Sequence, residues 1–435
     1  MPCLAAYVTT RLRRFGAKSR SRDRIRLLVL NDHRFRPDLM ELQDHPDIEL
    51  LILPPSLQAR INWIFLNRLA AHFENPGWAL VYAFTRAEDP EIRESREALY
   101  RYLCRFLPHL ARIGRLDGIA SCSFSYLGDL DWQRAGRAAG VPFFALHKEN
   151  MKDEAIHGMI IRRYRDAGYR FTGDRLFLFN AMERFVVRET GICPDERISI
   201  VGGLRTDRLH RRVERGECLA PGRQVVLFSF HHAVGLFKIN EGGGFFSDDP
   251  EIGFVSYFDL VHGEIGRLAQ QHPDIRFVIK PKWANHWIER IEDAIRRVAG
   301  VDPDSLPNLE ITATANAQEL IEGSSVVVGI NSTTLLEAKL IGRRVVVPLF
   351  AEAAGKYYDG HVYFKKYMDT FRVAKSPEEL GEAILAQLDG SEPAPPPIPQ
   401  GMVEDFLGYF DGKVRERVVA IMKQDIAAAR ARRGW

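Results

Sequence analysis

Short apolar runs alternate along the chain with segments in which apolar residues recur at helical spacing. The apolar runs are almost unbroken, as in the strands of parallel sheets that are covered on both faces. The pattern predicts strands over 25–31, 48–54, 79–84, 117–124, 142–147, 175–180, 198–202, 224–230, 276–281, 309–313, 325–330 and 345–350. It predicts helices over 57–73, 89–113, 129–139, 180–190, 255–270, 285–299, 334–341 and 376–389. This alternation is typical of α/β proteins with doubly wound sheets.

The chain has 435 residues, which is too long for one ordinary core, so we expect two main domains. A polar segment with Gly and Pro, 215–223, separates the two series of predicted strands. The last helix should pack through one apolar face. The predicted parts are a basic leader (1–22), two Rossmann-like domains (23–214 and 215–390), a stiff Pro-rich linker (391–400) and a C-terminal helix (401–435). The apolar positions of that helix are Phe410, Val414, Val418, Ile421 and Met422.

Composition narrows the class of protein. Hydrophobic residues make up 46% and charged residues 27%, as in soluble globular proteins, and a net charge of +3 does not indicate a nucleic-acid binder. The five cysteines are scattered without C-x-x-C spacing, which suits a reducing cytoplasm. The arginine-rich segment 11–26 has two interpretations, a solvated leader or a patch resting on an anionic membrane. We therefore predict a cytoplasmic protein, with peripheral contact at the inner membrane face as the second interpretation.

Candidate ligand-binding residues follow the predicted strands of the second half. In open parallel sheets, ligands bind beyond the carboxyl ends of the strands. The polar run 331–334 stands where a strand hands over to a helix, and such a junction offers free backbone N–H groups to an anion. Ser332 or Thr333 could equally be an ordinary N-cap. The candidate donor-site residues are His231, Lys280, Lys282, Thr312, Asn331, Ser332, Thr333, Thr334 and Glu337.

Glu337 has two interpretations. Its carboxylate could accept hydrogen bonds from ribose hydroxyls, or it could simply complement the positive end of the helix dipole.

In the first half, His147-Lys148-Glu149 follows a strongly apolar strand. An imidazole can accept the proton of an acceptor hydroxyl near neutral pH, and a carboxylate can orient it. The alternative is a set of local salt bridges to Asp153 and Glu154. His147 is the first candidate for a general base and Glu149 the second.

Four segments resemble motifs of GT-B glycosyltransferases, and in particular of CDP-glycerol glycerophosphotransferases and related capsule and surface-polysaccharide transferases. VVVGINSTTLLEAKLIGRRVVVPLF (326–350) resembles the donor-nucleotide segment, and FVIKPKW (277–283) resembles a Lys-x-His-Pro segment but lacks its His. ISIVGGLRTDRL (198–209) resembles the Gly-x-x-Arg-x-Asp segment that closes the first domain, and FFALHKEN (143–150) falls where a His-containing motif is expected. The resemblance implies a GT-B-like fold of two facing domains, with the C-terminal helix packing back.

The resemblance also implies a function. The protein would move a sugar or polyol phosphate from a nucleotide-activated donor to a surface-polysaccharide or lipid-linked acceptor. The second domain would hold the donor, and Asp32, Lys148 and Arg205 of the first would lie near the acceptor or the cleft. No metal site is expected, although a single Mg²⁺ on the donor phosphates stays open. The alternatives are a nucleotide-sugar 2-epimerase and a non-catalytic scaffold in polysaccharide assembly.

Overall fold

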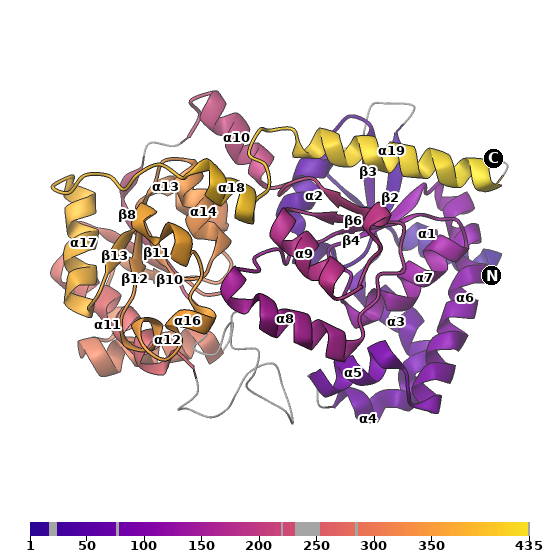
Figure 1. Ribbon diagram of the computed structural model, residues 1–435, viewed down its shortest axis with the longest axis horizontal. Coiled ribbons are helices and arrows are strands. Elements are labelled where there is room, and N and C mark those ends of the chain that lie inside the picture. Colours follow the sequence, from indigo (N-terminus) through magenta and orange to yellow (C-terminus); the bar gives the residue numbers. More distant parts are fainter. Residues whose placement is uncertain (17–23, 75–77, 219–220, 231–252, 283–285, 434–435) are drawn as a thin grey trace. The chain divides into compact units, whose positions relative to one another are not determined.

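The computed structural model (Figure 1) describes residues 1–16, 24–74, 78–218, 221–230, 253–282 and 286–433. The chain forms two compact units. The first contains Met1–Arg208 and the C-terminal Glu404–Trp435, and the second lies within Leu209–Val403. The chain first passes between the units within α10 (Thr206–Glu214), close to the boundary predicted at residue 215, and returns within α18 (Gln400–Phe406). Both units are α/β, as the sequence predicts.

The first unit is built on a seven-stranded sheet of order β1-β3-β2-β4-β5-β6-β7. The pairs are parallel except for the short edge strand β1, which is antiparallel to β3. The strands are β1 (Arg13–Phe15), β2 (Ile25–Val29), β3 (Ile48–Ile52), β4 (Gly118–Ser121), β5 (Phe143–Leu146), β6 (Arg175–Leu178) and β7 (Ile198–Ile200). The helices are α1 (Pro2–Arg11), α2 (Arg36–Gln43), α3 (Pro55–Leu66), α4 (Ala70–Phe73), α5 (Trp78–Arg86), α6 (Pro90–Gly114), α7 (Leu130–Ala138), α8 (Glu154–Ala167), α9 (Ala181–Glu189) and α19 (Val414–Arg433).

The second unit has a parallel six-stranded sheet of order β10-β9-β8-β11-β12-β13. The strands are β8 (Gly222–Phe228), β9 (Arg276–Lys280), β10 (Leu309–Ile311), β11 (Ser324–Gly329), β12 (Arg344–Pro348) and β13 (Arg372–Ala374). The helices are α11 (Val255–Gln271), α12 (His286–Ala299), α13 (Ala317–Gly323), α14 (Thr333–Leu340), α15 (Ala351–Ala354), α16 (Tyr358–His361) and α17 (Pro377–Asp389). This strand order is that of the Rossmann fold.

In each sheet, successive parallel strands are added first on one side of the starting strand and then on the other, so the strand order reverses once. In the first unit β3 lies on one side of β2 and β4 on the other, and in the second unit β9 and β11 lie on opposite sides of β8. The crevice at such a reversal, outside the carboxyl ends of the strands, is where open α/β sheets bind ligands. The residues that follow β2 and β4, and those that follow β8 and β11, are therefore the first places to look for function.

The end of the chain packs on the first unit, as predicted, but the helix predicted over 401–435 is two helices, α18 and α19 (Val414–Arg433), and Phe410 lies between them. Val414, Val418 and Met422 of α19 are buried in a core shared with β2, β3 and α2, and Figure 1 shows α19 lying along the sheet beside α2. Asp207 fixes the start of the helix, because its carboxylate accepts hydrogen bonds from the backbone N–H groups of Val414 (3.1 Å) and Arg415 (2.8 Å). The aspartate of the Gly-x-x-Arg-x-Asp segment therefore caps this helix.

The strand predicted over 79–84 is wrong, because this segment belongs to helix α5. Its inward-facing residues are Leu80, Val81 and Phe84, which lie at helical spacing. A short apolar run cannot be assigned to strand or helix by periodicity alone.

Part of the basic segment is folded into the first unit. Glu49 on β3 is fully buried and forms ion pairs with Arg14, Arg24 and Arg26. Burial acts to raise the pKa of Glu49, but the three guanidinium groups outweigh it and hold that pKa below its ordinary value. These arginines thus belong to the fold rather than to a solvated leader. Among the described residues, no helix is long and apolar enough to cross a membrane.

Candidate functional site

The polar run after β11 stands at the strand reversal of the second sheet. Ser332 is the N-cap of α14: its hydroxyl accepts a hydrogen bond from the backbone N–H of Thr334 (3.3 Å) and lies 2.7 Å from the Thr334 hydroxyl. Ser332, Thr333 and Thr334, which we call the hydroxyl patch, are all half-buried. The N-cap interpretation is correct for Ser332. The patch also stands at the strand reversal, where open α/β sheets commonly bind ligands, and its role toward a ligand stays a prediction.

Asn331 connects the hydroxyl patch to a neighbouring segment. Its backbone is in the left-handed region (φ 52°), which asparagine tolerates better than most residues. Its side-chain amide donates to the carbonyl of His361 (2.6 Å) and accepts from the backbone N–H of Tyr363 (2.8 Å). Both ends of the amide are therefore engaged in holding the segment after α16 against the start of α14.

Lys280 ends β9 at the same edge of the sheet. Its ammonium group donates to the carbonyl of Ala313 (2.9 Å), and no carboxylate among the described residues forms a salt bridge with it. Burial lowers the pKa of Lys280 from its ordinary value. Strand β8 lies between β9 and β11, so Lys280 and the hydroxyl patch are separated by two strand spacings, or roughly 10 Å.

The other predicted donor-site residues have different environments. Thr312 follows β10, one strand beyond Lys280, with its hydroxyl 3.5 Å from that of Thr314. Lys282 is exposed. Glu337 is only 3% exposed and already interacts within the chain, so a role toward ribose stays a prediction. His231 lies outside the described residues.

A buried Ser–His pair at the end of β8 was not predicted from the sequence. The Ser229 hydroxyl lies 2.8 Å from Nε2 of His262 on α11, whose Nδ1 lies 2.6 Å from the carbonyl oxygen of Phe258. Because a carbonyl only accepts, Nδ1 carries the proton and Nε2 accepts from Ser229. Burial lowers the pKa of His262 to about 4. The two residues are far apart in the sequence, so no local pattern could have linked them.

In the first unit, the structure buries the predicted base His147. Its side chain is 1% exposed, its ring lies 4.7 Å from that of Phe124, and its Nε2 lies 3.3 Å from a carboxylate oxygen of Glu183. Lys152 lies 3.6 Å from the other oxygen. Burial acts to raise the pKa of Glu183, but Lys152 and His147 outweigh it and lower that pKa. His147 therefore belongs to a buried ionic cluster with Glu183 and Lys152, whereas the sequence suggested Asp153 and Glu154 as partners.

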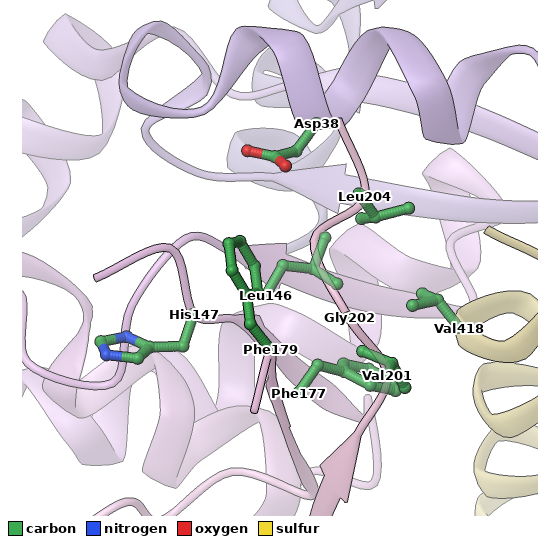
Figure 2. Close-up of a pocket in the computed structure, with 9 residues that line it drawn as sticks. All are labelled: Asp38, Leu146, His147, Phe177, Phe179, Val201, Gly202, Leu204 and Val418. Carbon is green, nitrogen blue, oxygen red and sulfur yellow. The ribbon is translucent and has the colours of Figure 1, made fainter. Parts of the chain in front are cut away.

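A small cavity lies beside His147 (Figure 2). Its volume of about 10 Å³ is enough for one water molecule at most. Figure 2 shows the imidazole ring pointing away from the apolar side chains that line the rest of the cavity. The cavity is therefore not a substrate pocket for His147.

The second candidate base is accessible. Glu149 is exposed, and its carboxylate lies 3.4 Å from the ammonium group of Lys148. Lys148 in turn donates to the carbonyl of Arg34 (2.9 Å), which joins the end of β5 to the segment after β2. The structure thus brings Lys148 and Glu149 together near the strand reversal of the first sheet.

The remaining candidates of the first unit, Asp32 and Arg205, have contacts or burial that belong to the fold. Asp32 is buried in the turn after β2. The backbone N–H of Arg205 donates to the buried carboxylate of Asp38 (3.3 Å). Burial raises the pKa of Asp38, against the opposing effect of Arg205.

A buried carboxylate that the sequence did not reveal, Asp129, accepts hydrogen bonds from Asn31, Gln58 and Ser121. Burial raises the pKa of Asp129 in spite of these bonds. Among the described residues, no group of three or more His, Cys, Asp or Glu side chains could hold a metal ion.

Comparison with known proteins gives likeness only at the level of structure. No family model matches the chain, and no curated protein matches it. Similar solved structures include a UDP-GlcNAc 2-epimerase from Neisseria meningitidis bound to UDP-GlcNAc, with 12% identity, 92% of this chain and 100% of that chain covered, and a TM-score of 0.46. The wall teichoic acid polymerase TagF has 14% identity, 74% and 76% coverage, and a TM-score of 0.44. An α,α-trehalose-phosphate synthase from Burkholderia vietnamiensis has 13% identity, 92% and 99% coverage, and a TM-score of 0.45.

Identities of 12–14% and TM-scores below 0.5 do not indicate which ligand this protein binds or which reaction it catalyses. Both have to be inferred from the residues of this chain. The architecture itself, with two α/β units and a last helix that packs on the first unit, has the parts that the resemblance to GT-B proteins implies. The resemblance is confirmed to that extent.

Proposed function

We propose that the protein is a GT-B-type transferase that moves a sugar or polyol phosphate from a nucleotide-activated donor to a surface-polysaccharide or lipid-linked acceptor. The observation that carries the proposal is the edge of the second sheet. There the hydroxyl patch and the start of α14 stand at the strand reversal, and Lys280 stands two strands away without an acidic partner among the described residues.

The donor would lie across this edge. The backbone N–H groups at the start of α14 and the hydroxyl patch can donate to one phosphate group. Lys280 can neutralise a second group roughly 10 Å away, a separation that a nucleoside diphosphate with its attached group can span. An anion beside Lys280 would offset the burial that lowers its pKa, because an opposite charge favours the protonated form.

The reaction would be a direct displacement. A base on the first unit takes the proton from an acceptor hydroxyl while its oxygen attacks the transferred group. The bond to the nucleotide phosphate breaks, and the leaving phosphate keeps the electron pair. Lys280 and the start of α14 would stabilise the negative charge that develops on that phosphate.

Glu149 is exposed and His147 is buried beside Glu183, so Glu149 is the better candidate for the base and His147 would have a supporting role. If so, Glu149→Gln should lower kcat by roughly 10²-fold or more, with nearly unchanged donor affinity, because general-base catalysis contributes on this scale. His147→Gln should mainly lower the melting temperature, since it leaves the buried Glu183 with a weaker partner. Single-turnover rates and melting curves of both variants make the distinction. The opposite pattern, in which Glu149→Gln is nearly fully active and a stably folded His147→Gln is inactive, would transfer the role of base to His147.

Turnover with and without an acceptor separates this proposal from the two alternatives. Thermal-shift screening against CDP, CMP, UDP, GDP and their sugars first identifies the nucleotide, because a ligand that binds the folded state raises the melting temperature. Nucleotide release that requires an acceptor supports a transferase. Free nucleotide formed without any acceptor would indicate an epimerase, and binding without turnover of any donor would indicate a scaffold.

A further inference from the structure

Helix α3 of the first unit exposes large apolar side chains and buries polar ones beside Ile61 and Leu66. Its buried face carries the polar side chains of Gln58 and Asn62, whereas Trp63 and Ile64 point outward and are 45% and 60% exposed. Large apolar side chains on a helix of a soluble protein normally face the core. An outward Trp–Ile pair therefore needs an explanation.

Hydrogen bonds fix the helix in this orientation. Gln58 donates to the buried carboxylate of Asp129 (2.7 Å), and Asn62 both donates to the carbonyl of Gly128 (2.9 Å) and accepts from the indole N–H of Trp132 (2.9 Å). Rotating α3 to bury Trp63 would leave these buried polar groups without partners, which is costly. The exposure of Trp63 and Ile64 is thus a property of the native fold.

The surroundings of this pair are basic and contain more exposed apolar side chains. Helix α6 packs against both α1 and α3, and Figure 1 shows the three helices on the side of the first sheet away from α19. Segments 55–73 and 98–116 contain no aspartate or glutamate. The outer surface of the three helices, which we call the basic apolar face, exposes Tyr7, Trp63, Ile64 and Ile113 together with Arg60, Arg68, Arg105 and Arg112.

The arginines of this face are not neutralised by the protein. None of Arg60, Arg68, Arg105 and Arg112 forms a salt bridge within the described part of the chain, whereas Arg96, Arg134 and Arg175 of the same unit do. On α3, Arg60, Trp63 and Ile64 recur at positions i, i+3 and i+4, so they share one stripe of the surface, and Arg68 lies in the turn that follows the helix. A cationic and two apolar side chains therefore lie side by side on the surface of α3.

We infer that the basic apolar face docks on the surface of an anionic lipid bilayer. Tryptophan favours the headgroup region, isoleucine gains by leaving water for the acyl boundary, and arginines are attracted by anionic headgroups. A nucleic acid would use the arginines but would leave Ile64 and Ile113 in water, so the apolar half of the pattern favours a bilayer. The inference does not rest on the proposed transferase reaction, and it can be tested without turnover.

The test is co-sedimentation of the full-length protein with vesicles of phosphatidylcholine alone, or of phosphatidylcholine and phosphatidylglycerol in equal parts. We expect binding to the anionic vesicles only, weakening as salt rises. Arg60→Gln with Arg68→Gln should lower partitioning roughly 10- to 30-fold, at about one tenfold step or less per basic residue. Trp63→Gln with Ile64→Gln should also lower it, because the apolar contribution is lost. Circular dichroism checks that each variant is folded.

Matched controls separate this face from exposure in general. Phe185→Gln with Val298→Gln removes two other exposed apolar side chains, and Arg162→Gln with Arg170→Gln removes two other exposed arginines that form no salt bridge within the described residues. Both control variants should bind vesicles like the parent. Absence of binding by the parent at physiological salt would overturn the inference, as would α3 variants that bind like the parent, a result that would move the attraction to the segment 11–26. A concentration-dependent dimer that Trp63→Gln with Ile64→Gln abolishes would reassign the face to a second copy of the chain.

Discussion

At the scale of single residues, each strand reversal is supported by a buried polar group that local sequence does not reveal. Asp129 joins the ends of β2 and β4 through Asn31 and Ser121, and His262 holds Ser229 at the end of β8. Such groups are stable only while their hydrogen bonds match their protonation state. Their titration is therefore a direct probe of the edges at which ligands are expected.

His262 should make the protein sensitive to mild acid. Its pKa is about 4 in the folded protein, below the ordinary value of about 6.5, so between these pH values the unfolded chain binds more protons. Its contribution to stability is present above about pH 6.5 and is lost as the pH falls toward 4. We expect the free energy of unfolding to drop by up to ~3 kcal/mol from this residue over that range.

Denaturant titrations of the parent and of His262→Gln at several pH values between 7 and 4 measure this contribution. The variant should show a shallower dependence on pH, because glutamine does not titrate there. His109→Gln, at a half-buried position of α6, serves as the matched control and should follow the parent. Equal slopes for the parent and His262→Gln would mean that His262 is not held neutral by burial.

At the scale of elements, the C-terminal helix α19 covers part of the first sheet, although it lies far from that sheet in the sequence. Its buried residues share a core with β2 and β3, and its Asp425 forms a bidentate ion pair with Arg175 of β6 (2.7 and 2.8 Å). Removing residues 401–435 should therefore lower the melting temperature clearly. Met422→Ala should destabilise by about 2–5 kcal/mol, as expected for truncation of a fully buried side chain.

The control is Gln424→Ala, at an exposed position two residues further along α19. It should leave the melting temperature within experimental error of the parent. A truncated protein that melts like the full chain would contradict the packing of α19 and would make this helix a free or partner-binding element.

The sequence predicted most of the sheet strands, including the three-residue β7 and β10, but it missed the edge strands β1 and β13 and the helices α1 and α8. Strands such as β2 and β11 and helices such as α6 and α11 are long and strongly patterned, so hydrophobic periodicity revealed them. The edge strands β1 and β13 have three residues each, and their pairing is decided by the sheet rather than by their own sequence.

The candidate site shows the same division. The hydroxyl patch and Lys280 could be proposed from the sequence because they follow predicted strands. Local sequence could not reveal three other features, because each joins residues that only the folded topology brings together. They are the Ser229–His262 pair, the hydrogen bonds to Asp129, and the contact between His147 and Glu183.

At the scale of the whole molecule, the proposed transferase uses residues of both units. The first unit offers Lys148 and the exposed Glu149, and the second offers the hydroxyl patch and Lys280 at a Rossmann-type strand reversal. The central claim is that the second unit binds a nucleotide at this edge. If that claim is wrong, the transferase proposal loses its main support, whereas the membrane inference does not.

Calorimetric titration of the nucleotide selected by the thermal-shift screen tests the claim most directly. The titrated proteins are the parent, Lys280→Ala, Ser332→Ala with Thr334→Ala, and the control Lys375→Ala. Lys375 follows β13, the strand at the far end of the same sheet. It is therefore also a lysine after a strand, but it lies away from the proposed nucleotide site. Circular dichroism confirms folding, and loss of the Ser332 cap alone should cost only about 1 kcal/mol of stability.

The account predicts that Lys280→Ala weakens binding roughly 10- to 150-fold, as expected when a hydrogen bond to a charged group is lost. The variant of the hydroxyl patch should also bind more weakly, and Lys375→Ala should bind like the parent. If Lys280→Ala and the hydroxyl-patch variant are folded and bind the nucleotide as tightly as the parent, the second unit does not use this edge for a nucleotide and the central claim is wrong.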